Sequence, residues 1–161
     1  AQQAKKERAD AKAARMAAQA ERASIKARKE AIKTIAQLIA DAQIVFNAFI
    51  RERDKGKGCF VCGRPFTDKP GQVQHAGHVR SRGAAGHLRF NEDNCHGECE
   101  GCNGPHGAKP HQIEAGAIAR IGAERYAELC ADNTPHKWQR DELIAIKHEY
   151  RAKLKELKGR T

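Results

Sequence analysis

A helical pattern without breakers opens the chain. From Ala1 to about Lys33 there is no Gly or Pro, and the commonest residues, Ala, Lys, Arg, Gln and Glu, all favour helix. Apolar residues from position 25 onward recur at spacings of seven or of three and four, which places them on one stripe: Ile25, Ile32, Ile35, Ile39, Ala42, Phe46 and Phe49. We expect this stripe to be buried against the rest of the chain or against a second subunit. Gly56 and Gly58 are expected to end the helix.

A hairpin and further helices are predicted for the remainder. Apolar and polar residues alternate over residues 73–79 and 87–90, around a turn rich in Gly and Ala at 83–86, which is the pattern of a β-hairpin. After a loop at 104–110, apolar spacing indicates a helix near 113–121, another near 126–129 and a longer one after Trp138. The sequence therefore predicts an α+β fold that is mainly α-helical. Its parts are a helical arm at 1–57, a small core at 58–110 and a C-terminal helical region at 111–161.

The charge of the chain indicates a polyanionic partner. Its 161 residues carry a formal net charge of +10, with a pI near 9.5. Residues 1–33 alone hold ten Lys and Arg against four Asp and Glu, which fits either a solvated helix or an arm that contacts phosphates. Aromatic residues make up only 5% of the chain, so backbone contacts to duplex DNA are favoured over base stacking on single strands.

The cysteines point to a metal in a reducing compartment. Four of the six form two Cys-x-x-Cys pairs, Cys59/Cys62 and Cys99/Cys102, which is the spacing of a structural Zn²⁺ site. Cys95 and Cys130 are interpreted as inert, and Cys95 as a small buried residue. No run of 18 apolar residues and no apolar leader is present, so we expect a cytoplasmic protein that does not span a membrane.

The segment between the cysteine pairs resembles the zinc-stapled HNH (ββα-metal) nucleases, and is similar to phage endonuclease VII. The resemblance is closest to the NinG (Rap) recombination nucleases of lambdoid phages. It is carried by Ala76-Gly77-His78, by the run 88–96 and by Cys99-x-x-Cys102-Asn103, and it extends over most of the chain beyond about residue 25.

The resemblance assigns roles to individual residues. It implies that His78 is the general base, that Asn94 braces the hairpin, and that Asn103 is a ligand of a catalytic Mg²⁺ or Mn²⁺ ion. His75 stands where the family usually has Asp, and as a second ligand it would favour Mn²⁺ over Mg²⁺; the alternative is a surface histidine. His96 is a candidate contact to the phosphate or metal, with a packing role equally open.

Three arginines are candidates for holding backbone phosphates on either side of the cut, with ordinary surface charge as the alternative: Arg80, Arg82 and Arg89. Three further histidines, His87, His106 and His111, are interpreted as surface residues.

The function expected from this resemblance is a structure-specific endonuclease, acting as a homodimer on branched DNA such as Holliday junctions and D-loops. The homodimer is favoured because such junctions have near two-fold symmetry. The residues by themselves indicate a nuclease, and the branched substrate comes from the resemblance alone. Two alternatives are a duplex-nicking HNH enzyme and a zinc-dependent DNA-binding protein without hydrolytic activity.

Overall fold

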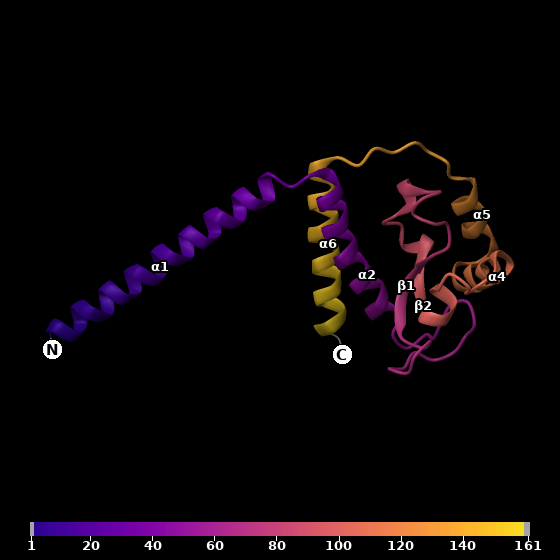
Figure 1. Ribbon diagram of the computed structural model, residues 1–161, viewed down its shortest axis with the longest axis horizontal. Coiled ribbons are helices and arrows are strands. Elements are labelled where there is room, and N and C mark those ends of the chain that lie inside the picture. Colours follow the sequence, from indigo (N-terminus) through magenta and orange to yellow (C-terminus); the bar gives the residue numbers. More distant parts are fainter. Residues whose placement is uncertain (1, 160–161) are drawn as a thin grey trace. The chain divides into compact units, whose positions relative to one another are not determined.

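The structure, a computed structural model, describes residues 2–159, and it divides after Gln37 into two units (Figure 1). Unit 1 contains the long helix α1 (Gln2–Ala31), and α2 (Ile35–Arg53) begins at its end. Unit 2 contains the rest of α2 and the remaining elements, in order β1 (Gln74–His78), the 3₁₀ helices η1 (Gly86–Leu88) and η2 (Glu92–Asn94), β2 (Cys95–Cys99), α3 (Glu100–Asn103), α4 (Pro110–Ile121), α5 (Ala123–Ala131) and α6 (Arg140–Gly159). The mainly helical α+β architecture is as predicted. No helix within residues 2–159 is long and apolar enough to cross a membrane.

The predicted apolar stripe does not lie on one continuous helix, and its first residues are not buried within the chain. Ile25, Ile32 and Ile35 are 44%, 80% and 40% exposed, and no residue of α1 is buried. The helix breaks between them because Thr34 starts a new one. The side chains of Thr34 and Gln37 each bond to the other's backbone N–H, at 3.3 and 2.8 Å, which is a capping box. Ile25 therefore lies on α1 and Ile32 in the turn after it, whereas Phe46 and Phe49 lie on α2.

The second half of the stripe forms the core of unit 2. α2 and α6 lie side by side (Figure 1), and Phe46 of α2 makes edge-to-face contacts with Phe90 and with Tyr150 of α6, at centroid distances of 5.7 and 4.8 Å. Phe46 is fully buried, as is Ala42 one turn earlier. Burial of each such aromatic side chain contributes roughly 2–3 kcal/mol. Residues 38–57, expected as part of an arm, thus pack with the hairpin and the C-terminal helices.

The hairpin has a different second strand from the predicted one. β1 pairs antiparallel with β2, with His75 opposite Glu98 and His78 opposite Cys95, whereas residues 86–88 form the 3₁₀ helix η1. The alternation at 87–90 does not mark a strand. It arises because Leu88 and Phe90 are both buried in hydrophobic clusters, whereas the residues between and before them are less buried. β2 ends at Cys99, so the strand leads directly into the second cysteine pair. His87, expected at the surface, is mostly buried, and its Nε2 contacts the backbone oxygen of Asp132 at 3.0 Å.

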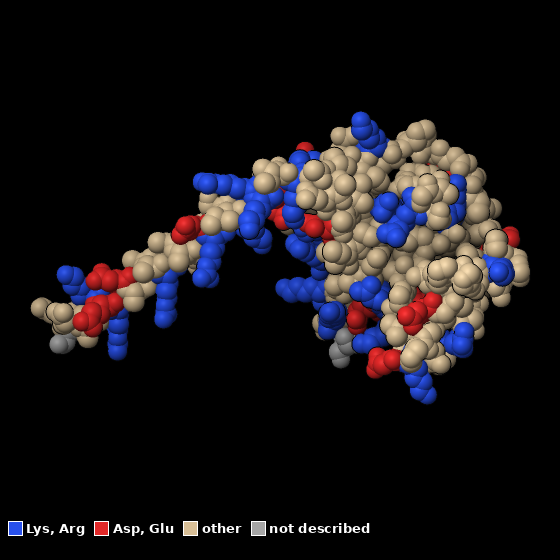
Figure 2. All heavy atoms as spheres, viewed as in Figure 1, with Lys and Arg blue, Asp and Glu red and all other residues tan. Residues whose placement is uncertain are grey.

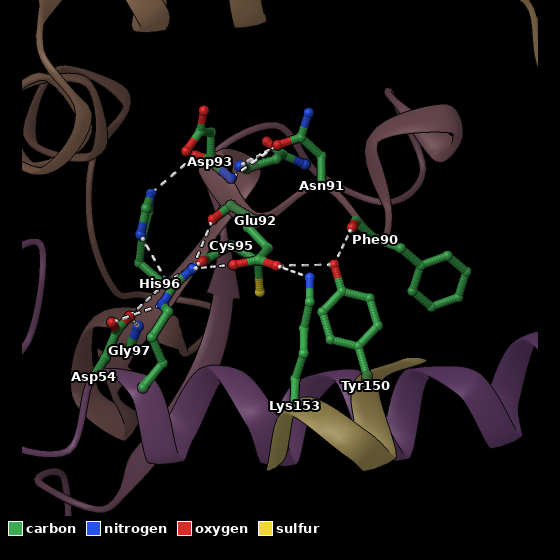
Figure 3. Close-up of polar contacts among 12 residues, drawn as sticks. Asp54, Phe90, Asn91, Glu92, Asp93, Cys95, His96, Gly97, Tyr150 and Lys153 are labelled. Atoms are coloured by element: carbon green, nitrogen blue, oxygen red, sulfur yellow. Dashed lines mark hydrogen bonds and ion pairs between the residues drawn. The ribbon is translucent and has the colours of Figure 1, made fainter. Parts of the chain in front are cut away.

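A buried ion pair fastens the end of α2 to this hairpin (Figure 3). Arg53 donates to both carboxylate oxygens of Asp54 at 2.9 and 2.8 Å, and also to the carbonyls of Glu92 and Cys95 at 3.1 and 2.8 Å. Asp54 is 1% exposed and accepts the backbone N–H of Gly97 at 2.8 Å. Burial alone would raise the pKa of Asp54, but the hydrogen bond and charge of Arg53 outweigh it and hold this pKa well below its ordinary value.

The same network reaches α6 and encloses a histidine. The Glu92 carboxylate accepts from Lys153 at 2.8 Å and from the hydroxyl of Tyr150 at 3.3 Å (Figure 3). His96 lies on β2, 4% exposed, with Nε2 donating to the Asp93 carbonyl at 2.9 Å and Nδ1 facing an N–H of Arg53 at 3.2 Å. Burial first, and then the charge of Arg53, lowers the pKa of His96 to about 4.

We predict that neutral His96 makes the fold sensitive to acid. Its pKa is depressed in the folded state, so its contribution to stability is fully present above about pH 6.5 and is lost as the pH falls toward 4. The free energy of unfolding should fall by about 2 kcal/mol from this group between pH 7.5 and pH 5. Urea unfolding of the His96→Gln variant, followed by circular dichroism, should show a loss smaller by that amount than the wild type.

The matched control is His111→Gln, because His111 is exposed. It should lose as much stability as the wild type over the same pH range. Equal losses in His96→Gln and His111→Gln would contradict the assignment.

Candidate functional site

Four thiols meet at one point in unit 2. The sulfur atoms of Cys59, Cys62, Cys99 and Cys102 all lie within 4.8 Å of one another, and those of Cys62 and Cys99 are 3.8 Å apart. Sulfurs held at about 2.3 Å by a tetrahedral zinc ion are separated by about 3.8 Å. The predicted cysteine set therefore forms a cluster of the size that a Zn²⁺ ion requires.

Backbone hydrogen bonds shape the turn that carries the first cysteine pair. Cys59 N–H donates to the Arg64 carbonyl at 2.8 Å, and Gly63 N–H donates to the Cys59 carbonyl at 2.9 Å, closing a tight turn. Gly58 has a φ of 68°, and a Cβ there would lie 2.8 Å from the carbonyl oxygen of Gly63, so glycine is required. Although burial opposes it, the hydrogen bond from Arg64 lowers the pKa of Cys62 to about 6 and favours the thiolate.

The second cysteine pair positions Asn103 beside His75. Cys102 and Asn103 lie on the short helix α3, which follows β2 directly. The Nδ2 atom of Asn103 is 3.4 Å from Nδ1 of His75 on β1. Both residues line a cavity of about 330 Å³. The structure thus brings together the two side chains that the sequence proposes as ligands of a catalytic cation.

This cavity is basic and carries no carboxylate. Besides His75 and Asn103, its lining side chains include Arg82 and two residues of α2, Asn47 and Arg51. Sequence reasoning missed Asn47 and Arg51, because in an amphipathic helix they read as ordinary solvated positions. Their signal lies in the helical spacing: Asn47 and Arg51 are four residues apart and so share one face of α2.

His78 lies at the end of β1 but does not line the cavity. Alternation along the strand places it on the same face as Gln74 and Ala76, which do line it. Its Nε2 faces the Arg89 carbonyl at 3.1 Å, and its Nδ1 lies 3.8 Å from the sulfur of Cys95. Burial and the charges of Arg82 and Arg89 outweigh the Arg89 carbonyl and lower the pKa of His78 below its ordinary value. Both ring nitrogens of His78 are therefore in contact with protein groups, Nε2 with the Arg89 carbonyl and Nδ1 with the thiol of Cys95.

Cys95, next to this imidazole, is a buried thiol. It is 0% exposed, and burial raises its pKa to about 12. It lies outside the group of four cysteines that converge. This agrees with the prediction that Cys95 is a small buried residue and not a metal ligand.

Asn94 and Arg80 act within the fold. The buried amide of Asn94 accepts the backbone N–H of Arg80 at 2.8 Å and donates to the carbonyls of Arg80 and Leu88 at 3.0 and 3.1 Å, which is the bracing role that the resemblance implies. The guanidinium of Arg80 donates to the Leu129 carbonyl at 2.9 Å and to Asn133 Oδ1 at 2.7 Å. Arg80 therefore closes the end of α5, and these donors are used within the fold.

Arg82 and Arg89 differ from Arg80 in having spare donors. Arg82 is exposed at the cavity. Arg89 donates to Gln43 at 3.3 Å, and its Nε is the one buried side-chain nitrogen or oxygen within residues 2–159 without a hydrogen bond. His96, in contrast, has both ring nitrogens engaged by the protein and borders a separate cavity of about 610 Å³. The structure places it with the Arg53 network, apart from His75 and Asn103.

Gly77 and Glu98 show how closely the two strands pack. The Glu98 side chain, 4% exposed, crosses over Gly77, where a Cβ would lie 1.8 Å from its Oε2. Any larger residue at position 77 would displace Glu98. The Gly between Ala76 and His78 is therefore a packing requirement of the hairpin.

Loss of one thiol is predicted to release the metal. Cys99→Ser should bind substoichiometric zinc and lose cooperative unfolding, since Cys99 is fully buried within the cluster. Cys130→Ser should keep one zinc per chain and wild-type stability, because Cys130 is exposed and outside the cluster. Metal content by plasma emission spectrometry, read with thermal unfolding, checks both. A folded Cys99→Ser protein with one tightly bound zinc would overturn the assignment.

Comparison with known proteins gives a consistent picture. The family model described as Bacteriophage Lambda NinG protein matches residues 1–160. Among curated relatives, Protein ninG of Escherichia phage lambda is 39% identical over 130 residues, covering 80% of this chain and 61% of the relative. Protein ninG of Salmonella phage P22 is 38% identical over 127 residues, covering 79% and 61%.

The chain spans about three fifths of the length of these curated relatives. No solved structure matches it significantly. Because the family model covers nearly every residue and the relatives share more than a third of their aligned positions, the chain belongs to the NinG family.

Proposed function

We propose that the chain is a metal-dependent DNA endonuclease of the zinc-stapled HNH type, which cuts branched recombination intermediates such as Holliday junctions and D-loops. The observation that most supports this proposal is the cavity in which His75 and Asn103 lie in contact. Its described lining includes two arginines and no carboxylate. Acidic groups would repel a phosphodiester, whereas Arg51 and Arg82 attract it and offer planar pairs of donors to its oxygens.

The donors in the cavity suit a divalent cation. Two ligand atoms about 2.1 Å from one ion are separated by roughly 3.0–3.4 Å, which fits the 3.4 Å between the Asn103 amide and His75. The oxygen and nitrogen of an amide are interchangeable by rotation, so Asn103 can present its oxygen to the ion. When bound, Mg²⁺ or Mn²⁺ would stabilise negative charge on the phosphate and on the departing 3′ oxygen. An imidazole in the pair favours Mn²⁺.

His78 is proposed as the general base. The Arg89 carbonyl holds its Nε2–H, so Nδ1 is the nitrogen that would take a proton from the attacking water, in exchange for its contact with the Cys95 thiol. Its lowered pKa keeps it neutral at pH 7, which the role requires. Water then attacks phosphorus, the bond to the 3′ oxygen breaks, and 5′-phosphate ends remain.

The zinc cluster has a positioning role in this scheme. It ties the turn at Cys59–Cys62 to the start of α3, so that Asn103, one residue beyond Cys102, is held against β1. Preference for branched DNA is proposed from the resemblance of the sequence to NinG recombination nucleases. Recognition through phosphates fits that preference, since phosphate contacts read shape and charge instead of bases.

A second candidate is a zinc-dependent DNA-binding protein without hydrolytic activity. Two observations favour it: His78 does not line the cavity, and its Nδ1 faces the sulfur of Cys95. The ligand pair also lacks the carboxylate that holds hard cations most firmly. The two candidates differ in whether phosphodiester bonds are broken.

We predict that His78→Ala slows cleavage strongly and leaves DNA binding intact. A four-way junction and a linear duplex of the same arm sequences are incubated with zinc-loaded protein and Mg²⁺ or Mn²⁺. Wild-type protein should cut the junction preferentially, and His78→Ala should cut it about 10²–10⁴ times more slowly. Junction affinity, measured by fluorescence anisotropy, should change less than about threefold, because His78 is not a phosphate ligand.

His106→Ala is the matched control, since His106 is an exposed histidine in the loop before α4. It should cut as the wild type does. Equal cutting by wild type and His78→Ala would remove His78 from the mechanism, and binding without any cutting by the wild type would support the second candidate. Equal cutting of junction and duplex would point to a nicking enzyme.

We further predict that His75→Asp shifts the metal preference. A carboxylate is a harder ligand than an imidazole, so the ratio of Mg²⁺-supported to Mn²⁺-supported cleavage should rise about tenfold or more. Arg82 and Arg51 remain in place to hold the DNA. His75→Ala, measured in the same metal titrations, should weaken cleavage with both ions. An unchanged ratio in His75→Asp would place the cation elsewhere.

A further inference from the structure

Helix α1 has an exposed surface that neither the cysteine cluster nor the cavity explains. It runs for 30 residues without one buried side chain, and even Met16 is 62% exposed. Tertiary packing normally provides most of the stability of a helix, so one without buried residues has a partner outside its own fold or serves only as a solvated extension. The distribution of its charges distinguishes these cases.

The cations of α1 form a single stripe. Lys and Arg recur at alternating steps of three and four residues, with one Gln in the series: Lys5, Arg8, Lys12, Arg15, Gln19, Arg22, Lys26 and Lys29. At 3.6 residues per turn, these positions lie within about a third of the helix circumference. Figure 2 shows such a row of Lys and Arg side chains projecting from one side of α1. We refer to these eight residues as the basic stripe.

Most of the other charges of α1 lie away from the basic stripe. Glu7, Asp10 and Glu21 fall on other sides of the helix, as do Lys6 and Arg28, whereas Glu30 lies on the stripe at its C-terminal end. A helix selected only for solubility would mix both signs around its surface. From Lys5 to Lys26, about six turns, no acid falls on the stripe, and this separation of the signs indicates a binding surface for an extended anion.

The three- and four-residue spacing of the cations also excludes a coiled-coil dimer interface on this face of α1. A coiled coil places apolar residues at the positions that repeat every three and four residues, and like charges there repel between copies. α1 has cations at those positions, so the basic stripe is not a dimer seam. The predicted apolar dimer seam does not continue into α1 either, because the helix is broken before Thr34.

We propose that α1 is a duplex-binding arm, whose basic stripe contacts the phosphate backbone of DNA adjoining the site of cleavage. From Lys5 to Lys29 the stripe extends about 36 Å, the length of about ten base pairs of B-form DNA. Duplex phosphates are the extended, regularly spaced anions that such a row fits. That the anion is DNA rests on the proposed function. The basic stripe is a DNA-contacting surface in addition to the cavity.

The test compares two pairs of cations in the full chain. The stripe variant is Lys12→Gln with Arg15→Gln, and its matched control is Lys6→Gln with Arg28→Gln, which removes the same charge from the other sides of the same helix. Glutamine keeps the helix propensity nearly unchanged. Affinity for a junction with arms of roughly 25 base pairs is measured by anisotropy over a range of salt concentrations.

The stripe variant should bind about tenfold more weakly at low salt, and the slope of log affinity against log salt should shrink by about 1.8, or 0.9 for each lost phosphate contact. The control should stay within about twofold. With arms shortened to roughly 8 base pairs, wild type and stripe variant should converge, because the arm then has no duplex to follow.

Equal affinities and slopes for the two variants would overturn the proposal while leaving the nuclease function standing. So would a native mass that falls from dimer to monomer in the stripe variant with no change in salt slope, since α1 would then be a subunit contact. If wild-type protein binds neither junction nor duplex, the proposed function fails and the arm fails with it.

Discussion

The fold of unit 2 depends on the ion pair between Arg53 and Asp54. These adjacent residues end α2, yet their side chains reach backbone atoms of Glu92, Cys95 and Gly97, and so join a helix to a two-stranded sheet too small to be stable alone. A buried pair of this kind stabilises little by itself compared with apolar packing. Removal of one partner is severe, at about 3–5 kcal/mol, because the other charge stays buried. Its effect here is to fix the register between α2 and the hairpin.

The register between α2 and the hairpin determines which side chains line the cavity. α2 brings Asn47 and Arg51 to β1, while the cysteine cluster holds the start of α3, which carries Asn103, against the same strand. These two attachments differ chemically. The first consists of the hydrogen bonds and charges of Arg53 and Asp54, and the second consists of the four cysteine thiols. Together they position a small set of polar side chains on an otherwise marginal sheet.

Sequence reasoning was most successful where the chemistry is local. The Cys-x-x-Cys spacing identified the four thiols that converge, and helical spacing identified α4, α5 and α6. It failed where tertiary contacts decide. Residues 87–90 alternate like a strand, but residues 86–88 form the 3₁₀ helix η1, in which Leu88 is buried. The strand that does pair with β1 is β2, which ends at Cys99, the first residue of the second cysteine pair.

The apolar stripe shows the same limit at a helix boundary. The periodicity of apolar residues does not reveal that Thr34 caps a new helix. The spacing Thr34-x-x-Gln37, however, is a recognisable capping-box motif. For the candidate site, the residues His75 and Asn103 were predicted together. The contribution of Arg51 was not, because which face of α2 meets β1 is decided by the burial of Phe46 and Phe49.

The absence of carboxylates among the described residues that line the cavity has a thermodynamic consequence for the proposed function. A divalent cation that entered the cavity alone would meet arginine charges and no carboxylate, and a phosphate that entered alone would meet no metal. Each would therefore supply the charge that the other lacks, so the two would bind cooperatively. By linkage, DNA would tighten the hold on the cation by the same factor by which the cation would tighten the hold on DNA.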